Sequence, residues 1–274
     1  MKLIQNTLSV GATKPFTFLH VSDLHLAESD ENDSPERRAF ADSRKRHFLF
    51  YTEALSFLKD YVKRTGYPVV NTGDLLDFIT PESMRVAKEL IEQTDMLYVA
   101  GNHEFWHCYK NRFHFDDSVE AYAEKSQSLA EVERVLGRNI RFSRREINGV
   151  NLVCMDNGNY NIDQELFEQL KAVEAEGKPI LLFMHIPLYS EGLGKDAKYG
   201  LGLPDSYLDA LTPPERRERE SDALTHEICD HIRRSPLIRY VLSGHIHHNV
   251  EILGQGEQDQ IVTGLNTLRE ITVL

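Results

Sequence analysis

Seven side chains with metal-binding atoms stand in polar turns that directly follow apolar segments of the chain. They are two aspartates, one asparagine and four histidines: Asp23, His25, Asp74, Asn102, His185, His245 and His247. This set offers oxygen and nitrogen atoms but no thiolate, which suits Mn, Fe, Zn or Ni better than Cu(I) or an iron–sulfur cluster. Such residues at the ends of separate segments indicate a shared metal centre.

The number of donors favours two metal ions. A single tetrahedral zinc uses fewer ligands than this set provides, whereas a bridging Asp74 would give each of two ions four protein donors. Two ions about 3.5–4 Å apart form a clamp for in-line displacement at phosphorus. Only Asp23 and Asp74 are anionic, so two divalent ions leave a positive excess that attracts phosphate. We expect two divalent or trivalent ions, with Mn or Fe favoured over Zn and Ni.

His103 directly follows Asn102, and neighbouring residues in a turn point in different directions. We therefore do not expect both to bind the same ion. A histidine beside the metals can protonate a leaving oxygen and stabilise charge on the transferring phosphoryl group. It needs an orienting acceptor, for which Asp77 is the candidate. His103 and Asp77 are thus the predicted catalytic residues, and Glu104 is interpreted as a supporting carboxylate.

The apolar segments before these turns are predicted to be buried strands, over residues 16–22, 67–72, 96–100, 179–184 and 237–242. Functional loops of open α/β sheets gather at the carboxyl ends of the strands, so we expect the five turns to meet at one sheet edge. Periodicity and helix-start signals predict helices over residues 35–64, 82–93, 117–136, 164–175 and 215–234. A hairpin over 140–155, turning at Asn148-Gly149, and antiparallel strands over 250–274 complete the pattern.

Two further regions have less specific patterns. Residues 187–214 are rich in Gly and Pro and follow His185, and aperiodic loops longer than about 12–15 residues are usually functional or disordered. We expect a lid or substrate wall there, with contacts from Lys198, Tyr199 and Tyr207. A basic cluster is interpreted as a solvated helix face, with substrate phosphate contact as the alternative; it comprises Arg37, Arg38, Arg44, Lys45 and Arg46. Histidines outside the motifs, His20 among them, are interpreted as structural.

Length and composition set the broad class. The chain has 274 residues, 41% hydrophobic and 27% charged, and neither a repeat nor a long linker divides it, so we expect a single domain over residues 1–274. A net charge of −12 argues against a general binder of nucleic acid or anionic membranes. No apolar run reaches the length of a membrane span. The absence of a secretory pattern and the three dispersed cysteines favour a cytoplasmic location.

Five motifs together resemble the calcineurin-like metallophosphoesterases. They are DLH at 23–25, GDLLD at 73–77, GNHE at 101–104, His185 after an apolar strand, and GHIH at 244–247. They occur in the family's order and span most of the chain. The resemblance implies a four-layer α/β/β/α sandwich with two central sheets. It implies His103 as general acid with Asp77 as its partner, and assigns each metal four ligands: Asp23, His25, Asp74 and His247 for one, and Asp74, Asn102, His185 and His245 for the other.

The resemblance also bears on the substrate. Phosphoprotein phosphatases of this superfamily carry an arginine where this chain has Phe78, and nothing in the sequence places Arg112 at the site. We therefore favour a small-molecule phosphodiesterase, with cyclic nucleotides among the candidate substrates. A metal-bridging hydroxide would attack phosphorus while His103 assists the departing oxygen. The alternatives are a phosphomonoesterase, a nuclease (against which the acidic balance argues), and a non-catalytic scaffold of the same fold.

Overall fold

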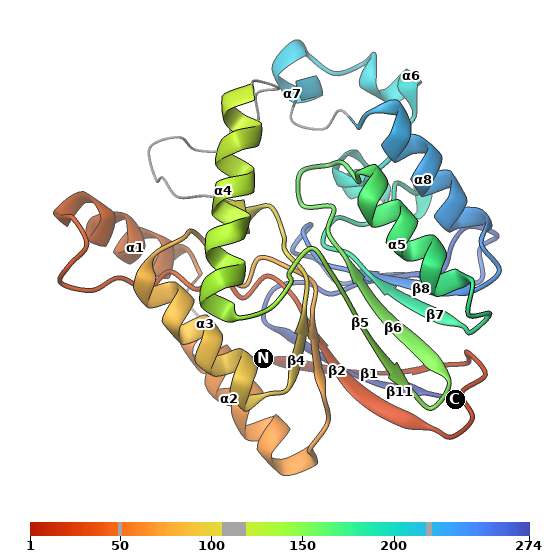
Figure 1. Cartoon of the computed structure of the whole chain (residues 1–274), viewed down its shortest axis with the longest axis horizontal. Coiled ribbons are helices and arrows are strands. Elements are labelled where there is room, and N and C mark those ends of the chain that lie inside the picture. Colours follow the sequence, from red (N-terminus) through yellow and green to blue (C-terminus); the bar gives the residue numbers. More distant parts are fainter. Residues whose placement is uncertain (49–50, 106–118, 218–220) are drawn as a thin grey trace.

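The computed structural model describes residues 1–48, 51–105, 119–217 and 221–274. Two β-sheets lie at its centre (Figure 1). Within the described residues, the first sheet has five strands, in the order β1 (Lys2–Leu8), β11 (Thr267–Val273), β2 (Phe16–Val21), β3 (Val69–Asn71) and β4 (Met96–Tyr98). Within the same residues, the second has six, in the order β5 (Phe142–Ile147), β6 (Val150–Met155), β7 (Ile180–Phe183), β8 (Ile238–Ser243), β10 (Gln260–Val262) and β9 (Val250–Ile252).

Both sheets are mixed. Strands β2, β3 and β4 are parallel to one another, and so are β6, β7, β8 and β10. Strand β11 runs antiparallel to β2 and parallel to β1, while β5 and β9 form antiparallel edges of the second sheet. The parallel centres bring the carboxyl ends of neighbouring strands together, which is where ligands bind in α/β sheets.

Three apolar clusters define the layers of the molecule. One lies between the two sheets and contains Phe18 and Ile271 of the first sheet with Leu181 and Phe183 of the second. The rings of Phe18 and Phe183 meet edge to face, with centroids 5.6 Å apart. The other two clusters lie on the outer faces of the sheets, where helices cover them. Because strand residues alternate between the two faces, each central strand contributes to an inner and an outer cluster.

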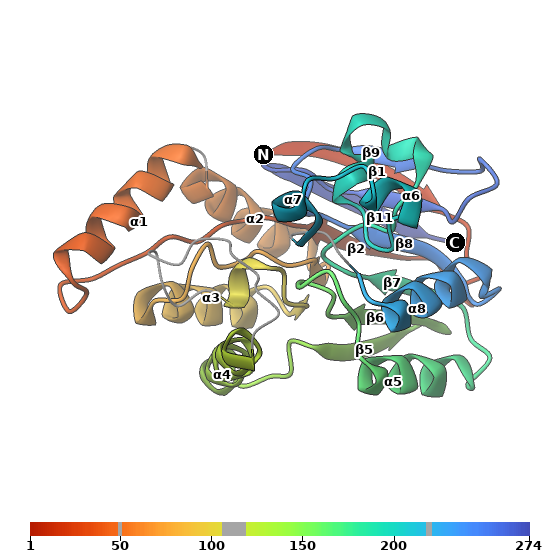
Figure 2. The same cartoon turned by 90° about the horizontal axis from the view of Figure 1, so that it is seen from above.

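Helices complete a four-layer α/β/β/α sandwich, which confirms the predicted fold (Figure 2). Helices α2 (Tyr51–Thr65), α3 (Pro81–Gln93) and α4 (Val119–Leu136) pack on the first sheet, and α5 (Gln164–Glu174) and α8 (Ala223–Arg234) pack on the second. Helix α1 (Pro35–His47) extends away from the sheets in both views. Nowhere in the described part of the chain is there a helix of the length and apolarity that a membrane crossing requires.

Several element predictions need correction. The helix predicted over residues 35–64 is two helices, because α1 ends at a C-cap Phe48 whose φ and ψ of −105° and 63° are not helical. The segment predicted as one helix over 215–234 contains the separate helices α7 (Pro213–Arg217) and α8. Strand β1 was not predicted, since its side chains are largely exposed and its sequence lacks an apolar run.

The tail and the strand ends also differ from expectation. The predicted antiparallel tail divides between both sheets: β10 pairs parallel with β8, and β11 pairs parallel with β1 and antiparallel with β2. The five polar turns follow β2, β3 and β4 of the first sheet but β7 and β8 of the second. The prediction of a single sheet edge was therefore wrong, because periodicity identifies strands but does not assign them to a sheet.

Candidate metal centre

The seven predicted ligands lie in turns with unusual backbone conformations. Five of them have a positive φ, namely Asp23 (56°), His25 (48°), Asp74 (51°), His245 (68°) and His247 (60°). A left-handed backbone at a residue other than glycine costs on the order of 1–3 kcal/mol and persists only where surrounding structure enforces it. These backbone conformations direct side chains from separate turns toward a common cluster.

Two glycines allow these turns to approach one another. A Cβ at Gly101 would overlap the Asp74 carboxylate, and a Cβ at Gly244 would overlap the side chains of Ser22 and Asp23. Any other residue at either position would force a ligand loop to move. The close approach of neighbouring turns therefore explains why Gly101 and Gly244 carry no side chain.

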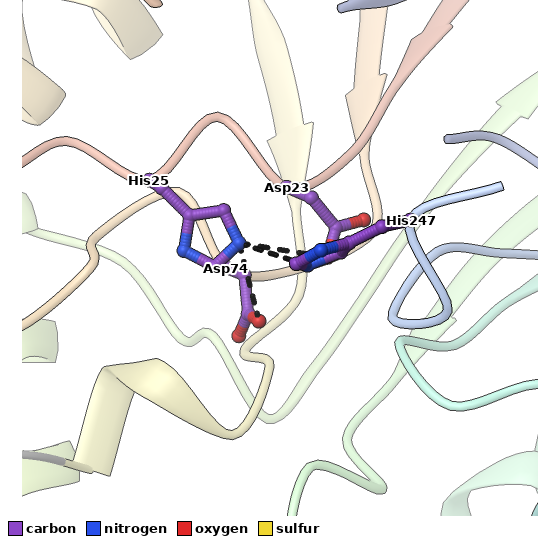
Figure 3. Close-up of side chains that lie close together, drawn as sticks. All are labelled: Asp23, His25, Asp74 and His247. Atoms are coloured by element: carbon purple, nitrogen blue, oxygen red, sulfur yellow. Dashed lines mark hydrogen bonds and ion pairs between the residues drawn. The ribbon is translucent and has the colours of Figure 1, made fainter. Parts of the chain in front are cut away.

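The first group of ligand atoms comes from Asp23, His25, Asp74 and His247, whose side chains point toward one another (Figure 3). The Nε2 atoms of His25 and His247 are 3.2 Å apart, and His247 Nε2 is 3.4 Å from Asp23 Oδ1. His25 Nε2 lies 3.9 Å from both Asp23 Oδ1 and Asp74 Oδ2. The sequence separation between His25 and His247 is 222 residues, so only the fold brings them together.

The second group comes from Asp74, Asn102, His185 and His245. His185 Nε2 lies 3.0 Å from Asn102 Oδ1 and 3.3 Å from Asp74 Oδ2. His245 Nδ1 lies 3.1 Å from Asn102 Oδ1 and 3.2 Å from His185 Nε2. Asp74 Oδ2 belongs to both groups, while Asp74 Oδ1 accepts a hydrogen bond from the His103 backbone N–H at 2.9 Å.

The donor atoms fit metal ions. Metal–nitrogen and metal–oxygen bonds of about 2.0–2.2 Å place ligand atoms roughly 3–3.5 Å apart, which is close to the spacing within both groups. The opposite ring nitrogens are already bonded: His25 Nδ1 donates to Asp77 Oδ1 at 3.0 Å and His185 Nδ1 donates to the Thr72 carbonyl at 2.8 Å. With Nδ1 bonded in each ring, Nε2 is the atom that faces the cluster, and any proton on it would be released when a metal ion binds there.

Two carboxylates of the cluster keep their negative charge although they are buried. Burial alone would raise the pKa of Asp23, but hydrogen bonding and charge from His247 and the charge of His185 lower it to about 2. The pKa of Asp74 is likewise held well below its ordinary range, because the nearby histidines outweigh its burial. Both carboxylates are therefore ionised at neutral pH, which is the form that binds a cation.

Comparison with known proteins identifies the family. The sequence matches the calcineurin-like phosphoesterases over residues 16–249. The chain belongs to this family. No curated protein matches the sequence.

Solved structures of similar fold accompany the family match. A dimetal phosphatase from Danio rerio aligns over 91% of this chain and 88% of its own, at 14% identity and a TM-score of 0.49. A phosphopantetheinyl hydrolase from Mycobacterium tuberculosis aligns over 91% and 90%, at 15% identity and a TM-score of 0.45. A purple acid phosphatase from yellow lupin seeds aligns over 92% and 44%, at 11% identity and a TM-score of 0.48.

In this calcineurin-like phosphoesterase, His103 lies beside the two ligand groups without belonging to either. Its Nδ1 donates to the backbone carbonyl of Asp77 at 2.6 Å, and its Nε2 is 3.8 Å from Asp74 Oδ2. Burial lowers the pKa of His103, but the charge of Asp74 and the bonds to Asp77 outweigh it and raise the pKa above its ordinary value. The ring is therefore oriented by one nitrogen and presents the other to the cluster.

The Asp77 carboxylate has different main partners from those the sequence suggested. Its Oδ1 accepts from His25 Nδ1 at 3.0 Å, whereas His103 Nδ1 is 3.4 Å away. Arg44 binds both carboxylate oxygens, with Nε at 2.5 Å from Oδ2 and Nη2 at 2.8 Å from Oδ1. The carboxylate therefore orients His25, a predicted ligand, and the backbone carbonyl of Asp77 orients His103.

Sequence reasoning missed Arg44, Phe48 and Tyr160. Arg44 was assigned to a solvated helix face, but its side chain is only 19% exposed and pairs with Asp77. Phe48 stacks on His25 with ring centroids 4.1 Å apart and a 5° interplanar angle. The helical spacing of Arg44 and Phe48 is the signal that was available. Tyr160, whose hydroxyl lies 2.7 Å from His245 Nε2, carries no local signal of this role.

Glu104 is the supporting carboxylate that the sequence predicts. It accepts backbone N–H bonds from Asp74 (3.1 Å), Leu76 (2.9 Å) and Gly101 (2.6 Å). It thereby joins the turns that follow β3 and β4. Burial and the charge of Asp74 raise the pKa of Glu104 to about 7.

The 187–214 stretch contains short helical segments, η2 (Glu191–Tyr199) and α6 (Asp205–Leu208), rather than a featureless loop. Tyr199 lies near His245, one of the predicted ligands, with ring centroids 6.4 Å apart, and the Lys198 amine is 5.0 Å from the Tyr199 ring centre. Tyr207 is in α6. Arg112 lies outside the described residues.

Proposed function

We propose that the protein is a dinuclear metal-dependent phosphodiesterase that acts on small phosphodiesters. The observation that carries this proposal is the pair of ligand groups that share Asp74 Oδ2, with His103 directed at them. Mn or Fe are the ions we expect, bound by Asp23, His25, Asp74 and His247 in one group and by Asp74, Asn102, His185 and His245 in the other. Ions bound there supply Lewis acidity and a nucleophile at neutral pH.

His103 is the proposed general acid. Its Nδ1 is held by the Asp77 carbonyl, and its Nε2 faces the cluster. A proton on Nε2 can pass to the oxygen of the departing alcohol, whose negative charge would otherwise develop unassisted. Asp77 supports the reaction at a second point, since its carboxylate holds His25 in the orientation that a metal ligand needs.

Charge favours a diester over a monoester. A dianionic monoester would gain from an additional cation beside the metals, but Phe78 occupies the position where phosphoprotein phosphatases carry arginine. Phe78 is 1% exposed and packs with Ala27 and Ala41. Arg44 is already paired with Asp77. A monoanionic diester needs less compensation from the protein.

A small cavity beside Asp23 supports a small ester group. Its volume is about 110 Å³, and its lining is mainly apolar or aromatic: Asp23, Leu24, His47, Phe48, Tyr51, Ala54, Leu265 and Asn266. A cavity of roughly 150 Å³ holds a benzene molecule. We infer that this cavity receives a short alkyl ester group, and that a nucleobase, as in cyclic nucleotides, exceeds it.

The test is hydrolysis of methyl p-nitrophenyl phosphate, a diester whose second ester group is small, and of the monoester p-nitrophenyl phosphate, by protein loaded separately with Mn, Fe, Zn and Ni. We expect the Mn- or Fe-loaded protein to prefer the diester. Preference for the monoester would instead favour a phosphomonoesterase. A folded protein that binds two ions yet hydrolyses neither ester would point to the non-catalytic scaffold.

His103→Ala separates catalysis from metal binding. We expect turnover to fall by about 10²–10⁴-fold, the usual contribution of a general acid, while two ions remain bound. His248→Ala is the matched control, because His248 is exposed and adjacent to the ligand His247. If His103→Ala turned over the substrate at the wild-type rate, the assignment of His103 as the general acid would be contradicted.

A further inference from the structure

A chain of fully buried polar side chains leads from β11 toward the second ligand group. It begins at Arg269 in β11 and passes through Thr263 and His20 to Thr72, all with 0% exposure. Arg269 Nε lies 3.1 Å from Thr263 Oγ1, which lies 2.8 Å from His20 Nδ1. His20 Nε2 lies 2.9 Å from Thr72 Oγ1. Most buried polar groups in proteins are hydrogen-bonded, as these four are.

Donor and acceptor capacities favour one direction for this chain. A guanidinium can only donate, so Arg269 gives a hydrogen to Thr263 Oγ1, and the Thr263 hydroxyl hydrogen is free to go to His20 Nδ1. His20 then carries its own hydrogen on Nε2 and donates to Thr72 Oγ1. Burial and the charge of Arg269 lower the pKa of His20 to about 3, so the ring is neutral and has a single N–H.

Arg269 is held at several points besides Thr263. Its Nη2 donates to the Val262 carbonyl at 3.1 Å, and its Nη1 donates to Asn6 Oδ1 at 2.8 Å and to Glu251 Oε1 at 2.5 Å. The guanidinium thus joins β1, β9, β10 and β11. These contacts fix one end of the chain in both sheets.

The other end of the chain meets the metal centre. The backbone carbonyl of Thr72 accepts from His185 Nδ1 at 2.8 Å and from Ser22 Oγ at 3.3 Å. The Thr72 backbone N–H donates to the Val21 carbonyl at 3.1 Å. His20 adds a bond to the Thr72 side chain, so this residue is held through its amide, its hydroxyl and its carbonyl.

We propose that His20, fixed by Thr263 and Arg269, is a positioning residue for the second metal ion. It holds Thr72, whose carbonyl selects the tautomer of His185 and directs His185 Nε2 at the ion. This inference rests on the proposed dinuclear function, because it assigns a purpose to His185 as a ligand. Outer groups that orient a metal-binding histidine typically change metal affinity by about 10–100-fold.

The test uses Thr263→Val, which removes the bridging hydroxyl with little change in shape. The readouts are calorimetric titration of the metal-free protein with Zn²⁺ and ¹⁵N NMR of the histidine rings in the zinc-loaded, diamagnetic protein. We expect one of the two Zn²⁺ ions to bind about tenfold more weakly or worse, the other to be unaffected, and His185 to lose its single Nδ1–H tautomer. Thr263→Ser should restore both properties.

Thr17→Val is the matched control. The Thr17 hydroxyl lies 3.1 Å from Thr272 Oγ1, and this part-buried pair joins β2 to β11 away from the metal centre. The Thr17→Val substitution should leave the affinities for both Zn²⁺ ions unchanged. Thr72→Val, which keeps the carbonyl but removes the hydroxyl that meets His20, should reproduce the loss and serves if Thr263→Val does not fold.

Two results would overturn the inference. In one, the valine variants bind both Zn²⁺ ions as tightly as the wild type, with an unchanged His185 tautomer. In the other, both ions weaken equally in these variants and in Thr17→Val, which is the behaviour of a general loss of packing. Failure of the proposed function is distinguishable, since it appears as fewer than two bound ions or no hydrolysis in the wild type itself.

Discussion

At the scale of single residues, the centre depends on side chains that serve two partners at once. Asp74 contributes Oδ2 to both ligand groups, and its Oδ1 is held by the His103 N–H. Asp77 uses its carboxylate for His25 and Arg44, and its carbonyl for His103. A change at either aspartate therefore acts on more than one contact. The effects of separate substitutions at Asp74 and Asp77 on metal binding should not add in the double variant.

Asp77→Asn tests the role of this carboxylate in metal binding. The substitution keeps the shape but removes the charge that binds Arg44 and favours the Nδ1–H of His25. We expect one of the two ions to bind about 10–100-fold more weakly, measured by titration with Mn²⁺. Asp33→Asn is the control. Asp33 pairs at 3.5 Å with Arg37, which lies in α1 as Arg44 does, but Asp33 has no contact with His25 or His103 among the interactions described above. Equal losses in both variants would contradict the assignment.

At the scale of elements, the break between α1 and α2 shapes one side of the site. Helix α1 carries Arg44 to Asp77, and the chain then turns at Phe48, which covers His25. Helix α2 follows and places Tyr51 and Ala54 in the wall of the small cavity. One continuous helix would not present Phe48 and the cavity wall in this way. Under the proposed function, the interrupted helix therefore forms part of the substrate side of the centre.

Ala54→Leu tests the cavity as the place of an ester group. The larger side chain should fill the cavity, whose volume is about 110 Å³, and lower kcat/KM for propyl p-nitrophenyl phosphate by about tenfold or more. The methyl ester should be nearly unaffected. Leu265→Ala, on the lining of the same cavity, should shift the preference toward the phenyl ester. Parallel changes for all esters would show that the cavity does not select the substrate.

At the scale of the whole molecule, each ligand group joins the two sheets. Asp23, His25, Asp74 and Asn102 follow strands of the first sheet, whereas His185, His245 and His247 follow strands of the second. Each group contains members of both sets. The apolar layer between the sheets holds these two halves together by burial, and under the proposed function metal coordination would join the same two halves.

Metal removal should consequently lower stability. A ligand at about 100 times its Kd adds roughly 2.7 kcal/mol to the free energy of unfolding, so the metal-free protein should unfold at a clearly lower temperature. Differential scanning calorimetry with and without chelator measures the change. The double variant His185→Ala/His247→Ala, which lacks one second-sheet ligand from each group, should lose most of the metal response. Equal unfolding temperatures with and without metal would contradict this coupling.

The donor types of the candidate ligands, the strands that precede them and the supporting role of Glu104 could all be predicted from the sequence. These features are local, because a buried strand needs an apolar run and a metal site needs particular donor atoms near its end. Only the tertiary structure decided that the turns come from two sheets, that Asp77 binds Arg44 and His25, and that His20 connects Arg269 to Thr72. Those contacts join residues far apart in the chain, and their partners are selected by packing across the fold rather than by spacing along it.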